Sequence, residues 1–164
     1  MALLGQWDAA AFFERLTSTN KLAKEKGFKF CRVSGLAGFE EAVGRLQASS
    51  AFVCVSDIAD GFTEINNTPH TRRVKTVFFA MRHAAENMRA REKCMQVMHE
   101  LFRQFASQLI QEKVRLEQNC IYIDPRITFT EIDQYFLSGC ACAYFQIATD
   151  VYMDLRFNSD EWDE

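Results

Sequence analysis

The residues best suited to carry chemistry in this sequence are its cysteines and histidines. Cys140 and Cys142 lie two positions apart, and in a strand this spacing places both sulfur atoms on one face. A zinc site needs further thiolates or imidazoles at tight loop spacings, and no CxxC or HxxxH motif supplies them. The spacing therefore predicts neither a metal site nor a redox-active cysteine pair.

Nucleophilic catalysis would need a cysteine beside a histidine that takes its proton. Cys94 and His99 are five residues apart in an expected helix, so they fall on different sides of it. His70 lies in an expected loop, and His83 lies at the end of an expected strand. A solvated or helix-capping role is the simpler interpretation for each histidine.

Paired carboxylates and phosphate-binding loops give no stronger signal. Glu100 and Glu112 are interspersed with arginine and lysine, as on an exposed helix face, whereas acid–base catalysis needs two acids that converge on one point. The segment Gly35–Gly38 lacks the spacing and the lysine of a P-loop, and the sequence contains no GxSxG motif. We therefore expect no enzymatic activity, no metal and no cofactor.

Two segments carry the strongest periodic patterns. Residues 87–118 contain no glycine or proline, and their apolar residues recur three or four positions apart, which predicts one long helix. At about 1.5 Å per residue this helix would span roughly 45 Å, so it either protrudes beyond the sheet or breaks near Gln111. Apolar and polar residues alternate through 140–157, which predicts a long strand with one buried face.

Caps, breakers and apolar runs place the remaining elements. Asp8 and Ser34 are candidate N-caps for two shorter helices. Pro125 falls within an apolar run and must lie at a sheet edge or a bulge. The expected helices are 9–24, 36–47 and 87–118; the expected strands are 28–33, 52–58, 71–83, 121–132 and 140–157; and 60–70 is an expected loop.

These elements predict an α+β fold class. We expect an antiparallel or mixed sheet of about four to five strands, with the long helix and the shorter helices packed on one face. The length of 164 residues suits a single domain, and 48% hydrophobic with 25% charged residues is typical of a globular one. We expect that domain to cover 1–157 and an acidic tail to cover 158–164.

Six cysteines are spread along the chain, and most of them lie in apolar runs. The chain is not small, and the sequence shows no signal peptide and no apolar stretch near the ~20 residues that cross a bilayer. We therefore expect free buried thiols, no membrane association, and a soluble protein that is cytoplasmic or part of a soluble particle.

Charge is unevenly distributed. The net charge of −3 does not favour nucleic-acid binding. Residues 71–93 hold seven basic and two acidic side chains, a net charge of +5, whereas residues 150–164 hold one basic and six acidic side chains, a net charge of −5. Such segments would steer head-to-tail self-association, although two solvated faces would give the same pattern.

The order of the expected elements resembles that of tail-terminator, or tail-completion (neck), proteins of long-tailed bacteriophages. The resemblance covers residues 52–162 and is sharpest in AYFQIATDVYMDLRFNSDEW, residues 143–162. This long amphipathic strand, closing in an Asp-Leu pair, an Asn and a Trp-containing acidic end, is similar to neck and tail proteins of prophages in Bacteroides-like hosts. The first helix and the strand at 28–33 lie outside the resemblance.

The resemblance implies a structural protein that forms a ring at the head-proximal end of the tail tube. It implies self-association and contact with tail-tube or head–tail connector proteins, in the cytoplasm during assembly and then in the virion. A closed ring needs a heterologous interface. The candidate interface residues are Arg72, Arg73, Lys75, Asp154, Asp160, Glu161 and Trp162. The candidate residues of a partner-contacting loop are Phe62, Asn66, Asn67 and His70.

Two other functions stay open at the level of sequence. A small-molecule or peptide-binding α+β domain without catalysis would use a pocket between sheet and helices. Its polar groups could come from Tyr122, Tyr144 and Tyr152. An enzyme would need titratable groups that converge from distant positions. The first candidates for such a site are His70, His83 and Cys94.

Overall fold

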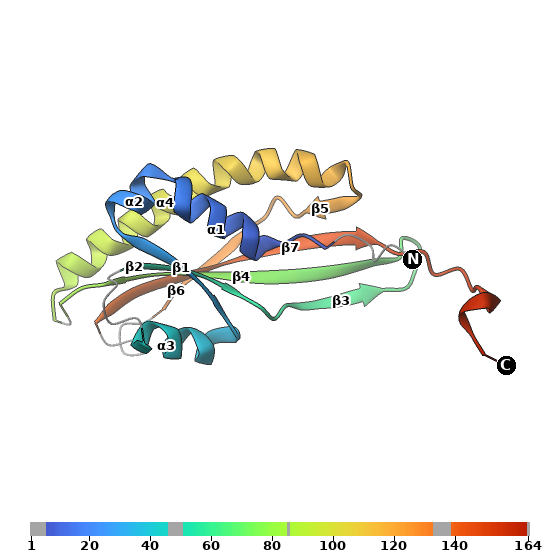
Figure 1. Ribbon diagram of the computed structural model, residues 1–164, viewed down its shortest axis with the longest axis horizontal. Helices are drawn as coiled ribbons and strands as arrows, with labels where there is room; N and C mark the ends of the chain where they lie inside the picture. Colours follow the sequence, from blue (N-terminus) through green and yellow to red (C-terminus); the bar gives the residue numbers. More distant parts are fainter. Residues whose placement is uncertain (1–5, 46–50, 85, 133–138, 164) are drawn as a thin grey trace.

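One mixed sheet with helices on both faces makes up the fold (Figure 1). The computed structural model describes residues 6–45, 51–84, 86–132 and 139–163. The helices are α1 (Ala9–Thr19), α2 (Lys21–Glu25), α3 (Gly35–Arg45), α4 (Met88–Glu117) and the short 3-10 helix η1 (Ser159–Glu161). The strands are β1 (Phe28–Val33), β2 (Ala51–Ser56), β3 (Asp60–Glu64), β4 (His70–Arg82), β5 (Ile121–Ile123), β6 (Thr128–Ile132) and β7 (Cys140–Tyr152).

The long antiparallel pair β4 and β7 forms the centre of the sheet. Each has 13 residues, and they pair along their whole length. Two short strands share the outer edge of β4, namely β2 and β3, and two more share the outer edge of β7, namely β5 and β6. β1 adds to β2 in parallel. The sheet is therefore mixed, as expected, but it has seven strands where four to five were predicted.

Alternation along the central strands gives each face of the sheet its own core. On one face, Phe79 and Phe145 pack with Phe105 of α4 and with residues of α1 and α2. On the other face, Phe78 stacks on Phe39 of α3 at 4.8 Å between ring centroids. The expectation that all helices pack on one face is wrong, because the β1–α3–β2 connection places α3 on the opposite face (Figure 1).

Three predicted helices and strands differ from the observed ones by a break or by more than two residues at one end. The expected helix 9–24 is interrupted at Asn20, whose side chain caps α2 by accepting a hydrogen bond from the Ala23 N–H at 2.9 Å. The expected strand 121–132 is divided into β5 and β6, with Pro125 between them. The final strand ends at Tyr152, before the end of the alternating pattern at 157.

The long helix α4 runs without a break from Met88 to Glu117. The Asn87 side chain caps it by accepting from the Ala90 N–H at 3.0 Å. It lies along β7 and β5, with Met98, Leu101 and Phe105 buried against the sheet (Figure 1). Among the described residues, no helix combines the length and the apolar character needed to cross a membrane.

The segment expected to be a loop at 60–70 contains a strand instead. β3 pairs with the first half of β4, with Gly61 opposite Arg73. A Cβ atom on Gly61 would meet the Arg72 carbonyl group, so only glycine allows the two backbones to approach this closely.

We therefore expect Gly61→Ala to lower the free energy of unfolding by about 1–3 kcal/mol, because the obstructing atoms belong to the backbone and cannot rotate away. Urea unfolding followed by circular dichroism measures this loss. Gly38→Ala is the matched control, because its added Cβ would meet only atoms at ordinary contact distances of 3.6 Å or more. Equal stability of the two variants would contradict the assigned β3–β4 register.

Candidate interaction surfaces

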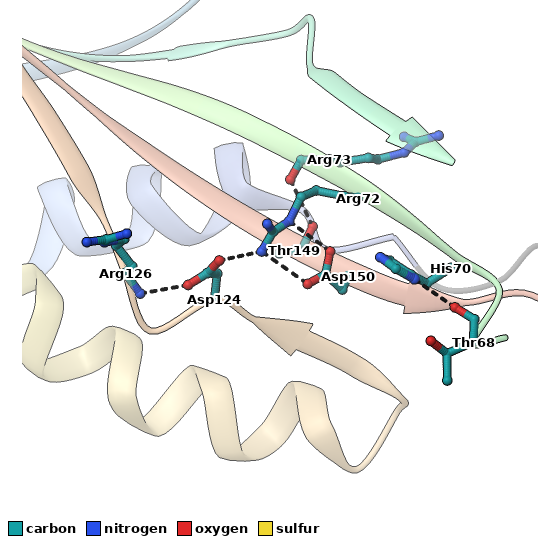
Figure 2. A network of polar contacts seen from close by, with 8 residues as sticks. All are labelled: Thr68, His70, Arg72, Arg73, Asp124, Arg126, Thr149 and Asp150. Atoms are coloured by element: carbon teal, nitrogen blue, oxygen red, sulfur yellow. Dashed lines mark hydrogen bonds and ion pairs between the residues drawn. The ribbon is translucent and has the colours of Figure 1, made fainter. Parts of the chain in front are cut away.

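Arg72 lies at the centre of an ion cluster on the face of the sheet that carries α3 (Figure 2). Its Nε donates to Asp150 Oδ1 at 3.0 Å, and its Nη2 donates to Asp150 Oδ2 at 3.2 Å and also to Asp124 Oδ2. The Arg126 N–H donates to Asp124 Oδ1 at 2.8 Å. Each of the three charged side chains is only 25–30% exposed.

The cluster joins β4, β7 and the turn after β5. Hydrogen bonding from the Arg126 N–H and from Arg72 holds the pKa of Asp124 below its usual range, although partial burial opposes this. Asp124 therefore stays ionised at neutral pH and keeps its bonds to Arg72. The guanidinium of Arg72 thus stabilises the fold through ion pairs within the domain, and it is not a free cation for a partner.

The other two basic interface candidates differ from Arg72 in their surroundings. Arg73 lies on the opposite face of β4 and is exposed, and its side chain makes no ion pair with any residue that the structure describes. Lys75 donates to the carbonyl oxygens of Ser56, Asp57 and Ile58 at 3.2, 3.0 and 3.4 Å. Burial lowers the pKa of Lys75. Of the three, Arg73 is the cation best placed for an intermolecular contact.

The acidic candidates lie on an extension that we call the C-terminal arm, residues 153–163. It leaves the end of β7 and projects away from the sheet (Figure 1). Met153 still contacts the domain, because its N–H donates to the Pro69 carbonyl at 2.9 Å. Beyond it, Asp154 pairs with Arg156, whose side-chain and backbone N–H groups lower the pKa of Asp154 to about 2.

Apolar side chains on the C-terminal arm are largely exposed. Phe157 is 80% exposed and Trp162 is 68% exposed, and the two rings stack with centroids 6.4 Å apart. Asp160 and Glu161 belong to η1 and precede Trp162, and neither forms an ion pair within the described part of the chain. This arrangement presents an aromatic pair flanked by free carboxylates.

The loop candidates lie at the same end of the sheet as the base of the C-terminal arm. Phe62 and His70 belong to β3 and β4, and their rings meet edge to face at 5.9 Å. Asn66 and Asn67 are exposed in the connection between those strands. The His70 ring nitrogen Nδ1 hydrogen-bonds to the Thr68 carbonyl at 2.8 Å (Figure 2).

The positive segment 71–93 does not form one continuous patch. Arg72 and Arg73 lie near the C-terminal arm, whereas Arg89, Arg91 and Lys93 lie in the first turns of α4, at the other end of the molecule (Figure 1). In the first group, Arg72 is already ion-paired with Asp124 and Asp150 within the domain. The second group forms no ion pair with the residues that the structure describes.

An open groove of about 800 Å³, which we call the α4 groove, lies beside the first half of α4. Its lining residues are Met88, Arg89, Arg91, Glu92, Met95, Gln96, His99, Glu100, Arg103 and Glu131. His99 Nε2 contacts Glu131 Oε1 at 2.9 Å, and Arg103 pairs with Glu100. The sequence did not indicate this groove, because β6 enters it from far along the chain.

The residues considered for catalysis do not converge. His70 lies at the arm end of β4 and His83 follows its opposite end, while Cys94 lies on α4. Within the described ranges, no group of three or more His, Cys, Asp or Glu side chains is placed to hold a metal ion.

Cys31 and Cys54 lie opposite each other on β1 and β2, with their sulfur atoms 2.6 Å apart. Hydrogen bonding with the Cys54 thiol lowers the pKa of Cys31, although partial burial opposes this effect, whereas burial raises the pKa of Cys94. All six cysteines are free. Because the thiolate is the nucleophile, Cys31 should be the more reactive of these two half-buried thiols.

We therefore expect iodoacetamide at neutral pH to alkylate Cys31 several times faster than Cys94. Peptide mapping by mass spectrometry over a time course measures both rates in one sample. Cys54→Ser replaces the thiol donor by a hydroxyl and serves as the control for the contribution of that bond. Equal rates at Cys31 and Cys94 in the unmodified protein would contradict the lowered pKa.

Comparisons with known protein families and with curated protein sequences identify no relative. No model of a known protein family matches the chain, and no curated protein is significantly similar to it in sequence.

Proposed function

We propose that this protein is a structural subunit of a protein assembly, and specifically a tail terminator that forms a ring at the head–tail junction of a long-tailed bacteriophage. The proposal combines the resemblance carried by residues 143–162 with the surface of the fold. It assigns no catalytic role to the chain. It places the protein in the cytoplasm during assembly and then in the virion.

One observation carries the assembly role. Across the end of the sheet where the C-terminal arm begins, the register places Phe62 of β3 and Tyr122 of β5 in one row, with Arg72 and Asp150 between them. Large apolar side chains are exposed at this end and along the arm. These residues are Phe62, Ile65, Tyr122, Tyr152, Leu155, Phe157 and Trp162, each 46–80% exposed. Apolar surface of this kind marks protein–protein contacts more often than it belongs to a free monomer.

The shape of the molecule supports a ring over a two-fold dimer. Five of the six largely exposed aromatic residues in the described part of the chain, all except Phe129, lie at one end or on the arm that leaves it, and the unpaired basic residues of α4 lie at the other (Figure 1). Two unlike ends favour a heterologous contact, which produces a ring when the rotation between subunits closes.

Negative-stain imaging of the concentrated protein tests this proposal. We expect closed rings of uniform diameter, and we expect those rings to stack at the end of tail tubes when tube protein from the same source is added. Monomers under all concentrations and salt conditions, both with and without tail tubes, would contradict the proposal.

A peptide-binding domain is the second candidate, because the α4 groove offers a concave surface of suitable volume. This function predicts saturable binding of extended peptides by a monomer. Peptide-library selection on the immobilised protein separates it from the first proposal, since an assembly subunit should enrich only sequences that resemble segments of its own chain.

A further inference from the structure

The C-terminal arm has the composition of a docking segment. Its two aromatic rings are exposed and contact each other, and they lie beyond the end of the sheet. Tryptophan is among the residues that contribute most to binding energy when a partner buries them. Residues 153–163 contain four acidic residues against one basic residue, so any surface that receives this segment should be apolar and positively charged.

The α4 groove has these properties at its outer end. Met88 is 54% exposed there, and Met95 lies deeper in the same groove. Methionine thioethers make favourable contacts with aromatic rings. A volume of about 800 Å³ is sufficient for the two aromatic side chains of the C-terminal arm.

Unpaired positive charge borders this part of the α4 groove. Residues 88–93 hold three basic side chains against Glu92, a net charge of +2. Arg91 donates through Nη2 to the Ile132 carbonyl at 3.1 Å, while its buried Nε has no hydrogen-bond partner among the described residues. The segment also forms the N-terminus of a 30-residue helix, where the helix dipole favours negative charge.

We propose that the C-terminal arm of one copy docks in the α4 groove of a second copy. In this arrangement Phe157 and Trp162 pack against Met88 and Met95. The carboxylates of Asp160 and Glu161 approach the basic residues at the start of α4. The contact is heterologous, because the arm and the groove lie at opposite ends of the folded molecule, so every subunit receives one arm and donates one (Figure 1).

This inference rests on the self-association in the proposed function and names the surfaces that produce it. The opposed charges identify a second copy as the occupant, because the same chain carries both halves of a complementary pair. Association should therefore weaken as salt rises, since Arg89, Lys93 and the carboxylates of the arm are exposed to solvent.

Two full-length variants test the docking. Phe157→Ala with Trp162→Ala removes the aromatic pair and leaves the α4 groove intact. Met88→Glu with Arg89→Glu alters the groove and leaves the arm intact, and acidic residues in a first helical turn do not weaken the helix. Each variant should associate about thirtyfold or more weakly with itself than the unmodified chain does. Ile110→Glu is the control, because Ile110 is 63% exposed on α4 but lies outside the groove.

Mixing the two variants gives the decisive result. One intact arm and one intact groove remain in the mixture, so light scattering coupled to size exclusion should show a one-to-one dimer that grows no further. If either variant alone assembles like the unmodified chain, the docking is wrong although self-association stands. Two monomeric variants that do not combine would also overturn it. The mixture could form the dimer while negative-stain imaging of the unmodified protein shows open chains in place of rings. That result would support the docking and contradict the ring.

Discussion

Replacing Phe79 by alanine is expected to lower the free energy of unfolding by about 3–5 kcal/mol, the largest single-residue effect that we anticipate. Phe79 lies in the second half of β4 and has no exposed surface. Its ring contacts those of Phe28, Phe102, Phe105 and Phe145, with centroids 5.3–6.4 Å apart. Truncation would leave a cavity among four rings that belong to three elements, β1, α4 and β7, and these cannot all move inward to fill it.

Thermal and urea unfolding of Phe79→Ala measure this effect, and we expect a fall in Tm of about 10 °C. Phe62→Ala is the matched control, because the same atoms are removed from a ring that is 52% exposed. The control should lose less than about 1 kcal/mol. Similar losses at the two positions would show that Phe79 is not the centre of the core.

Replacing Arg72 by methionine is expected to cost about 2–3 kcal/mol at neutral pH. Methionine keeps most of the volume of arginine but leaves Asp124 and Asp150 facing each other without their shared cation. Arg73→Met is the control, since Arg73 is exposed on the other face of β4, and it should change stability by less than about 0.5 kcal/mol.

The cost of Arg72→Met should depend on pH in a defined direction. The folded-state pKa of Asp124 is depressed, so its ionic contribution is fully present above the unfolded pKa of about 3.9. That contribution is lost as the pH falls through the folded pKa. The difference in stability between Arg72→Met and the unmodified protein should therefore shrink below about pH 4. A difference that stays constant from pH 7 to pH 3 would exclude an ionic origin.

The two longest elements were predictable because each carries a complete periodic pattern. Residues on α4 such as Met95, Met98 and Phe105 face the sheet as their spacing requires. β7 alternates between buried and less buried residues from Ala143 to Thr149, also as expected. Long strands and helices bury one face along their length, so their sequences record that face directly.

The short strands were harder to predict, and the reason is physical. β3 has five residues, and its pairing depends on the backbone of β4 more than on its own side chains. Asp60 and Gly61 favour a turn when their sequence is considered alone. The close approach at Gly61 becomes evident only when the neighbouring strand is in place.

The candidate surfaces were predictable in composition but not in arrangement. The sequence marked Arg72 as a surface cation, yet its partners Asp124 and Asp150 lie 52 and 78 residues away along the chain. The exposed aromatic character of Trp162 was anticipated, whereas the α4 groove was not. Contacts between distant segments depend on topology, and local patterns do not encode them.

The central claim is that this protein acts by joining copies of itself through unlike ends. Sedimentation velocity from dilute to concentrated solution, at low and at high salt, tests that claim most directly. We predict a concentration-dependent shift from monomer to larger species that high salt reverses. A single monomeric boundary at every concentration and at both salt levels would contradict it.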